Sequence, residues 1–400
     1  MIFKFNPESC RKDFAILSKP IIYFDNACMS LKPKQVVEKM LEYYNEYTAC
    51  GGRSAHRFAA RVEDEVLNAR NEVRGFINAK DALEIIFTKN TTEGINLVAN
   101  SFGLKEGDEV ILSDKEHNSN LLPFLKLSKK GIKLKFVDSN RDNSFNLEKF
   151  EDCLSEKTKL VSVVYASNID GVANPIPEIV KLAHKNGAKV LADGAQAVPS
   201  IPVDVRTLDV DFLAFSGHKM LGPTGTGILY GKMPLLEQMD QFIIGGETVV
   251  DSSYDRYTME GLPMKFEAGL QNYAGIIGLG EAVRYLKKVG IKRIHEHEID
   301  LNKIITDSLS PNAKISIIGP TEAERRSGIF SFNIMGLDPL DVSKILDVSR
   351  GILTRGGTHC VHSWFNKHNL KGSVRASLYL YNTEEEAKIF AEEVKKIAKI

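Results

Sequence analysis

The 400-residue sequence contains no long hydrophobic run and only five cysteines. No apolar stretch reaches the roughly 18 residues that a membrane-spanning helix requires. The N-terminal segment MIFKFNPESCRKDF is polar by its sixth residue and lacks the apolar centre of a signal peptide. The cysteines form no C-x-x-C pair, and an odd, dispersed set is typical of reduced thiols. We therefore expect a cytoplasmic protein without a membrane segment or a disulfide framework.

The sequence also lacks an excess of charge of either sign. Its 52 basic residues balance 52 acidic residues, so it has no electrostatic footprint for nucleic acid or an anionic membrane. Its hydrophobic residues make up 43% of the sequence, which is typical of a globular protein. A chain of this length is long enough for one large domain and a smaller one.

Seven short apolar runs alternate with helical patterns between about residues 84 and 230. They are EIIFT, EVILS, LKFVD, LVSVVYA, KVLAD, FLAF and GILYG. Their length and β-branched content are typical of buried strands, and the segments between them are long enough for crossover helices. The alternation predicts an α/β fold with a mostly parallel sheet, in which ligands bind at the carboxyl ends of the strands.

Beyond about residue 283, long charged helical segments frame shorter strands such as ISIIG and GIFSFNI. The last segment begins with a capping box, Thr383 and Glu386, and carries its acidic residues first and its basic residues last. We expect a large domain over residues 20–283. We expect a smaller α+β domain over residues 284–400, which residues 1–19 join.

Polar and titratable residues follow five of the predicted strands. After EIIFT, Asn90 and Glu93 have the spacing of a helix cap, which makes the helix start a candidate phosphate site. The residues at the five strand ends are Thr91, Thr92, His117, Asn168, Asp193, Gln196, Ser216, His218 and Lys219. Because these strand ends share one edge of the sheet, we expect one ligand site there.

The chemistry of these groups suggests pyridoxal phosphate (PLP) as the ligand. The helix start would hold the phosphate, His117 would stack on the ring, Asp193 would keep the pyridine nitrogen protonated and Lys219 would form a Schiff base. An apolar setting lowers the pKa of a lysine, which favours the free amine. Covalent attachment would also make a lysine tolerable at the end of a buried strand.

Several motifs resemble those of the class V aminotransferase family, most closely the SufS-like (group II) cysteine desulfurases. They are FDNACMSLKP, NTTEGINLVA, EHNSN, ADGAQAV, SGHKMLGPTGTGILYG, RGGTHC and VRASLYLYNT, in the family's order from about residue 20 to 385. The resemblance implies the PLP-dependent transferase (aspartate aminotransferase-like) fold and a homodimer with sites near the subunit interface.

The resemblance also implies a role for each site residue. Lys219 corresponds to the Schiff-base lysine, Asp193 to the pyridine-nitrogen partner and His117 to the ring-stacking residue. Gln196 corresponds to the group near the ring hydroxyl, while Thr92, Ser216 and His218 match phosphate ligands, with Thr91 beside them. Asn168 and Arg375 match substrate contacts, Arg375 as the carboxylate fork. Cys360 matches the catalytic cysteine, and Arg355 belongs to the same loop motif.

These roles imply a cysteine desulfurase that converts L-cysteine to L-alanine and carries the sulfur as a persulfide on Cys360. The sulfur would pass to an acceptor protein or scaffold, for iron–sulfur cluster assembly or another delivery pathway. A nucleophilic cysteine requires an accessible thiolate, and RGGTHC supplies an arginine, a histidine and two loop glycines around it.

Departures from the family keep other reactions open. Leu270 stands where a threonine normally reaches the phosphate of the neighbouring subunit, and Cys28 replaces an alanine near the substrate. Val361 to Trp364 replace small and proline-bearing residues after Cys360. The alternatives are selenocysteine lyase, cysteine sulfinate desulfinase or another β- or γ-elimination. A non-catalytic scaffold is the alternative from a different class.

Two histidine clusters invite a metal-site interpretation. His359, Cys360 and His362 form HCVH, but the sequence has no second paired cluster that would complete a metal site. His295 and His297 lie two residues apart, which places them on different faces of a helix, and we expect them at a solvated surface. We therefore expect no metal site.

Overall fold

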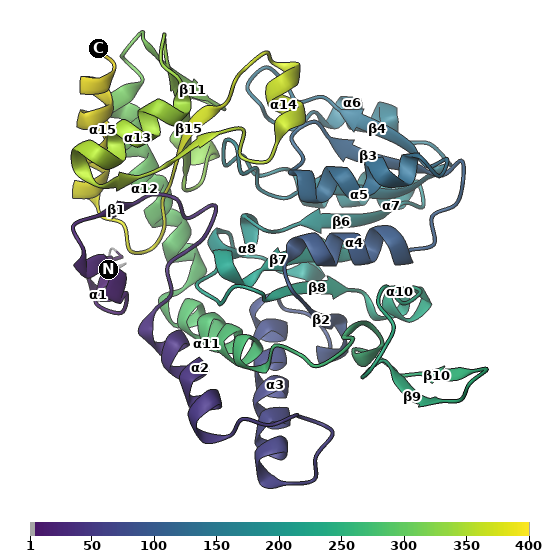
Figure 1. The fold of residues 1–400 in the computed structure, drawn as a ribbon. Helices are drawn as coiled ribbons and strands as arrows, with labels where there is room; N and C mark the ends of the chain where they lie inside the picture. The colour runs from purple at the N-terminus through teal and green to yellow at the C-terminus, as the bar shows by residue number, and fades with distance from the viewer. Residues whose placement is uncertain (1–4, 400) are drawn as a thin grey trace.

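The computed structural model describes residues 5–399, and its centre is a seven-stranded sheet (Figure 1). The strand order is β2 (Ile85–Thr88), β8 (Gly227–Gly231), β7 (Phe212–Ser216), β6 (Lys189–Asp193), β5 (Thr158–Val164), β3 (Glu109–Ser113) and β4 (Lys133–Val137). Only β8 runs antiparallel to its neighbours. All seven predicted strands are confirmed, and so is the mostly parallel sheet.

The strands alternate their apolar side chains between two cores, one on each face of the sheet. Leu213 and Phe215 of β7 point into one core, while Phe212 and Ala214 point into the other. The first core includes helices α3 (Arg57–Phe76), α6 (Leu147–Cys153), α7 (Ile176–Lys185) and α11 (Tyr273–Val289). The second includes α4 (Thr91–Ser101), α5 (Asn118–Ser128) and α10 (Met233–Gln238). Burial on both faces explains why these strands are continuous apolar runs.

A second, antiparallel sheet lies in the C-terminal part of the chain. Its order is β11 (Ile315–Ile318), β12 (Ile329–Ile334), β15 (Ser373–Ser377) and β14 (Arg355–Gly357). It shares a core with α12 (Ile291–Leu309), α13 (Pro339–Arg350) and α15 (Glu384–Ile397). The capping box at the start of α15 is confirmed, with Thr383 accepting from the Glu386 N–H.

The N-terminal segment contacts the C-terminal part of the chain. In α1 (Glu8–Arg11), Arg11 forms an ion pair of 2.8 Å with Glu386. Strand β1 (Ile22–Tyr23) pairs with β13 (Ile352–Leu353), and Phe24 belongs to the core of the smaller sheet. Residues 22–24 therefore pack with the smaller region, and the division of the chain at residues 20 and 283 stays a prediction.

The remaining elements are short, apart from α2 (Lys34–Glu46), which packs on α11. They are α8 (Ala197–Ser200), α9 (Val205–Leu208), α14 (His362–Lys367), η1 (Ala15–Ser18), η2 (Ala82–Glu84), η3 (Gly217–Lys219), η4 (Met264–Phe266) and η5 (Ala323–Arg325). Strands β9 (Val249–Ser252) and β10 (Tyr257–Met259) form a hairpin that projects from the body of the molecule (Figure 1).

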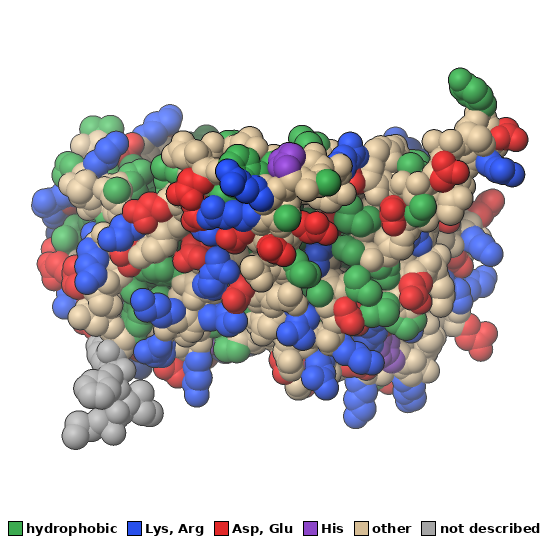
Figure 2. All heavy atoms as spheres, turned by 90° about the horizontal axis from the view of Figure 1, so that it is seen from below, with side chains coloured by type: hydrophobic (Ala, Val, Ile, Leu, Met, Phe, Trp, Pro, Cys, Tyr) green, Lys and Arg blue, Asp and Glu red, His purple; other side chains and the backbone are tan. Residues whose placement is uncertain are grey.

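The surface in Figure 2 carries basic and acidic side chains interspersed, in keeping with their equal numbers. Among residues 5–399, no helix has both the length and the apolar character to cross a membrane.

The expectation for the two helix histidines was wrong at one position. His297 is 6% exposed and its Nε2 lies 2.8 Å from the Asn382 carbonyl oxygen, so it is a buried residue of α12 and not a solvated one. His297 is buried because α12 packs on α15, and this tertiary contact cannot be seen in the sequence around His297.

Candidate active site

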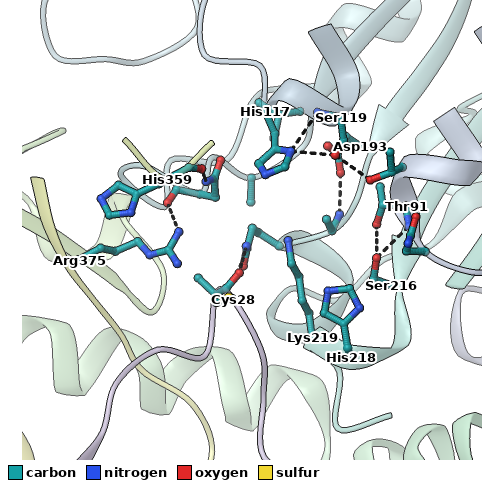
Figure 3. A pocket seen from close by; sticks show the side chains of 18 of the residues that line it. Cys28, Thr91, His117, Ser119, Asp193, Ser216, His218, Lys219, His359 and Arg375 are labelled. Carbon is teal, nitrogen blue, oxygen red and sulfur yellow. Dashed lines mark hydrogen bonds between the residues drawn. The ribbon is translucent and has the colours of Figure 1, made fainter. Parts of the chain in front are cut away.

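One pocket opens at the carboxyl ends of the large sheet's strands and extends to the smaller sheet (Figure 3). All the predicted site residues except Cys360 line it: Thr91, Thr92, His117, Asn168, Asp193, Gln196, Ser216, His218, Lys219, Arg355 and Arg375. The expected convergence of five strand ends is present, because β2, β3, β5, β6 and β7 each end at this edge.

Hydroxyl groups and a helix start form one end of the pocket. The Ser216 Oγ lies 2.6 Å from the Thr91 Oγ1 and accepts from the Thr91 N–H at 2.8 Å, while Asn90 caps helix α4. A Cβ at Gly227 would lie 2.5 Å from the Asn90 Cα, so only glycine lets β8 approach the helix start this closely. The N–H groups and hydroxyls at a helix start suit a phosphate.

Lys219 and His117 face each other across the middle of the pocket (Figure 3). Burial lowers the pKa of Lys219. Burial, together with the charge of Lys219, lowers the pKa of His117 to about 3, so its ring is neutral at physiological pH. The His117 Nδ1 accepts from the Ser119 N–H at 3.1 Å, which fixes the ring. A neutral, oriented ring is suited to stacking on a planar ligand.

Asp193 is buried at the tip of β6, and its Oδ1 accepts from the Ala195 N–H at 3.0 Å. Burial raises its pKa. Beside it, Gln196 donates to the Ala27 carbonyl at 2.8 Å. A carboxylate in this position is ready to accept a proton or a hydrogen bond from a cationic ring nitrogen.

Two arginines of the smaller sheet form the opposite end of the pocket. Arg355 and Arg375 are directly opposite residues of β14 and β15. Arg375 is almost wholly buried and donates to the Asn168 carbonyl at 3.0 Å and to the Asp25 carboxylate at 3.4 Å. The Arg375 Nε and the Asn168 Oδ1 are both buried without a partner. The Arg375 Nε is a donor that suits a ligand carboxylate, whereas the Asn168 Oδ1 is an acceptor that suits a ligand N–H group.

Cys360 lies beside this pocket and is not part of its lining. Its Sγ lies 3.6 Å from the Arg355 Nη2, and the side chain is partly exposed. His359 and Cys360 both adopt left-handed backbone angles, with φ of 50° and 61°. Two such residues in succession are unfavourable for side chains other than glycine, so the surrounding contacts must hold the turn.

Those contacts come from the segments that follow strands β3 and β5 of the large sheet. The Cys360 carbonyl accepts from the Asn118 N–H, and the His359 carbonyl accepts from the Asn168 amide, each at 2.8 Å. Helix α14, next along the chain, packs Val361, Trp364 and Phe365 in a cluster with Ile169 and Ile318. Figure 1 shows α14 between the smaller sheet and the edge of the large one. The loop is therefore fixed to both regions.

Three residues of this region received no role in the site from the sequence. Ser119 orients His117, Asp25 pairs with Arg375, and His359 is a buried lining residue that hydrogen-bonds Ser373 through Nε2 at 2.8 Å. Ser119 could have been found, since a serine two residues after His117 at a helix start is a typical capping neighbour. Asp25 lies in the motif FDNACMSLKP and His359 in RGGTHC, but neither motif indicates the tertiary contact that its residue makes. No group of three or more potential metal ligands occurs among residues 5–399.

Comparison with known proteins gives the same assignment throughout. The aminotransferase class-V family model matches residues 22–390. A probable cysteine desulfurase of Synechocystis sp. is 45% identical over 390 residues, 95% of this chain and 93% of that protein. A cysteine desulfurase of Shigella sonnei is 40% identical over 392 residues, 96% of each chain.

Solved structures agree with this match. A cysteine desulfurase from Thermococcus onnurineus NA1 superposes with a TM-score of 0.95 at 38% identity, covering all of both chains. The cysteine desulfurase CsdA of Escherichia coli superposes with a TM-score of 0.92 at 32% identity, covering 99% of each. These structures confirm the expected PLP-dependent transferase fold. The chain belongs to the aminotransferase class-V family.

Proposed function

We propose that this protein is a PLP-dependent cysteine desulfurase that converts L-cysteine to L-alanine and retains the sulfur on Cys360. One observation carries the proposal: a single pocket joins Lys219, His117 and Asp193 to an arginine pair that reaches a partly exposed thiol. The names of relatives at 39–45% identity support the same reaction. A plain lyase or aminotransferase would need the first group of residues without the thiol.

The residues present fit pyridoxal phosphate, on which the members of this family depend. When bound, the cofactor supplies an electron sink that stabilises negative charge at the substrate Cα. Four residues would hold its phosphate: Thr91, Thr92, Ser216 and His218. His117 would lie against the ring, Asp193 would pair with the pyridine nitrogen, Gln196 would contact the ring hydroxyl and Lys219 would hold the cofactor covalently.

At the other end, Arg375 would bind the substrate carboxylate, and its unpartnered buried Nε supports this role, because a buried donor without a partner is costly until a ligand satisfies it. Asn168 would contact the substrate through its Oδ1, which can accept from an amino group. The substrate Cα would then lie toward Lys219. As a free amine, which its lowered pKa favours, Lys219 would accept the Cα proton.

Cys360 would perform the sulfur transfer. Its thiolate attacks the substrate sulfur, a sulfur–sulfur bond forms and the substrate Cβ–S bond breaks. The electron pair of that bond stays with Cβ, which takes a proton and leaves as the methyl group of alanine. The Arg355 Nη2, 3.6 Å from the Sγ, can donate a hydrogen bond to the sulfur.

The surroundings of the reaction are part of the same proposal. The enzyme would pass sulfur to an acceptor protein or scaffold and would act as a cytoplasmic homodimer with its sites near the interface. Leu270, 64% exposed beside Gln271 and Asn272, would face the partner subunit where relatives use threonine. These statements derive from the family and stay predictions.

Borohydride reduction followed by peptide mapping tests the cofactor assignment. Purified protein should be yellow, and reduction should fix the cofactor on Lys219. A colourless protein, or a cofactor fixed on another lysine, would contradict the assignment and favour a scaffold.

Cys360→Ala tests the reaction, since it leaves Lys219, Asp193 and the hydroxyl end of the pocket intact. We expect this variant to keep its colour and to bind L-cysteine, with a spectral change on addition, but to release almost no alanine. A matched Cys153→Ala variant, which removes a thiol outside the pocket, should behave as the parent does. Alanine production by Cys360→Ala at close to the parent rate would exclude the desulfurase mechanism and leave the fold assignment intact.

A further inference from the structure

A second thiol, Cys28, lines the pocket itself. It is a free, partly exposed cysteine, and it is the only cysteine among residues 5–399 that contributes to the lining. Burial lowers the pKa of Lys219 and of Arg375, and a thiolate at Cys28 opposes that effect at both residues. The Cys28 sulfur therefore lies within electrostatic range of both cations, in agreement with the arrangement in Figure 3.

A short series of contacts connects Cys28 to Cys360. The Cys28 N–H donates to the Asp25 carbonyl at 3.1 Å, and the Asp25 carboxylate pairs with Arg375 at 3.4 Å. Arg375 is directly opposite Arg355 across the strand pair, where the Cβ atoms of opposed residues are about 5 Å apart. Arg355 in turn reaches the Cys360 Sγ. Cys28 therefore lines the same pocket as the arginine pair, and Cys360 contacts that pair through Arg355.

This end of the pocket is also prepared for an anionic ligand. The Arg375 Nε is buried and unpartnered, and both Arg375 and Arg355 line the pocket. Guanidinium N–H groups can donate hydrogen bonds to the sulfur atoms of a thiol–persulfide exchange. Cys50 and Cys153 are also partly exposed, but neither lines this pocket.

We propose that Cys28 is a second sulfur-carrying residue, which accepts the outer sulfur of the Cys360 persulfide. The proposal rests on the proposed function, because L-cysteine supplies the sulfur through Cys360. The Cys28 thiolate attacks the outer sulfur, a new sulfur–sulfur bond forms on Cys28 and the bond to the Cys360 Sγ breaks. Cys360 leaves as a thiolate, and no oxidant or reductant is consumed. The exchange frees Cys360 for another turnover while the first sulfur stays in the pocket.

Sulfur mapping on the cofactor-loaded protein tests this exchange. The enzyme is incubated with excess L-cysteine without reductant or acceptor, separated from substrate, alkylated with iodoacetamide and digested for mass spectrometry. We expect an added sulfur first on Cys360 and then on Cys28. The sulfide released by dithiothreitol should approach about two atoms per chain, one for each thiol.

Variants separate this exchange from random sulfur migration. Cys28→Ser should hold half as much sulfur, all on Cys360, while Cys153→Ser should hold the parent amount. Cys360→Ser should carry none on Cys28, because the supply passes through Cys360. Cofactor absorbance and the melting temperature show that each variant is folded.

The inference is overturned if Cys28 acquires no sulfur, if Cys153 acquires as much as Cys28, or if Cys28 acquires sulfur in Cys360→Ser. Its failure is distinguishable from failure of the proposed function. If the parent enzyme makes no alanine from L-cysteine, the desulfurase assignment fails. If it makes alanine and loads Cys360 while Cys28 stays unmodified, only the role of Cys28 fails.

Discussion

The pocket has two ends that are built in different ways. Thr91 and Ser216 of the hydroxyl end, with Asp193 and Lys219 next to them, lie at the ends of strands of one sheet, so the hydrogen-bonded ladder of that sheet sets their spacing. At the arginine end, the contacting residues come from distant parts of the chain. Arg375 contacts Asp25 and Asn168, and Arg355 contacts Cys360. The geometry of the hydroxyl end is therefore set by the large sheet alone. The arginine end depends on how two regions of the chain pack.

This difference leads to an expectation about mutations. Changes at the hydroxyl end should alter cofactor binding and all the chemistry that depends on it. Changes at the arginine end should alter substrate binding and sulfur transfer while the cofactor stays bound. Four substitutions test whether cofactor binding and substrate binding depend on different ends of the pocket, from the largest expected effect to the smallest.

Lys219→Ala should remove both covalent attachment of the cofactor and the residue that accepts the Cα proton. We expect alanine production to fall by at least about three orders of magnitude, since a positioned acid–base group alone contributes 10²–10⁴-fold. Alanine release and the visible absorption spectrum measure the two losses. A variant that keeps more than a tenth of the parent rate would contradict the role of Lys219.

Arg375→Lys keeps the charge but removes the planar fork that suits a carboxylate. We expect the KM for L-cysteine to rise about 10- to 100-fold, the equivalent of one charge-assisted hydrogen bond, with cofactor absorbance unchanged. Steady-state kinetics and a cofactor titration check the two parts. Loss of cofactor with an unchanged KM would show that the two ends are not separable.

His218 makes the stability of the hydroxyl end depend on pH. Burial, with the charges of Lys219 and Lys32, lowers its pKa to about 4 from an ordinary value of 6.5. Between these values the unfolded chain binds a proton at this position and the folded chain does not, so the free energy of unfolding falls as the pH decreases from 6.5 toward 4. His218→Asn should lose less stability than the parent between pH 7 and pH 5 in urea titrations. Equal losses would contradict the burial of this ring.

Leu270→Thr should have the smallest effect. If position 270 faces the phosphate of a neighbouring subunit, a threonine hydroxyl adds a hydrogen bond, and PLP affinity should stay equal or become a few-fold tighter. Equilibrium titration of the cofactor-free protein measures it. Clearly weaker binding would argue against this placement, while analytical ultracentrifugation tests the dimer itself.

The hydroxyl end could be predicted from the sequence with few errors. Buried parallel strands can be recognised in a sequence as apolar runs. When such strands pair in one sheet, the residues that follow them lie at the same edge of that sheet. Thr91, Asp193 and Lys219 were therefore placed together correctly, and the cap at Asn90 was read from local spacing.

The arginine end could be predicted only in part. The motif resemblance indicated Arg375, Arg355 and Cys360, but not the ion pair of Arg375 with Asp25 or the lining role of His359. The burial of His297 was missed for the same reason, because it depends on a partner helix that lies far away in the sequence.

The sequence by itself determined the seven strands of the central sheet, the residues at their ends and the chemical character of the ligand they suit. Local apolar patterns and capping residues carry that information, because hydrogen bonding and burial act within each element. Only the tertiary structure decided that Cys28 lines the same pocket as Arg355 and Arg375, and that Arg355 contacts Cys360. Their placement depends on the pairing of β14 with β15 and on the packing of two regions, which contacts between distant segments decide.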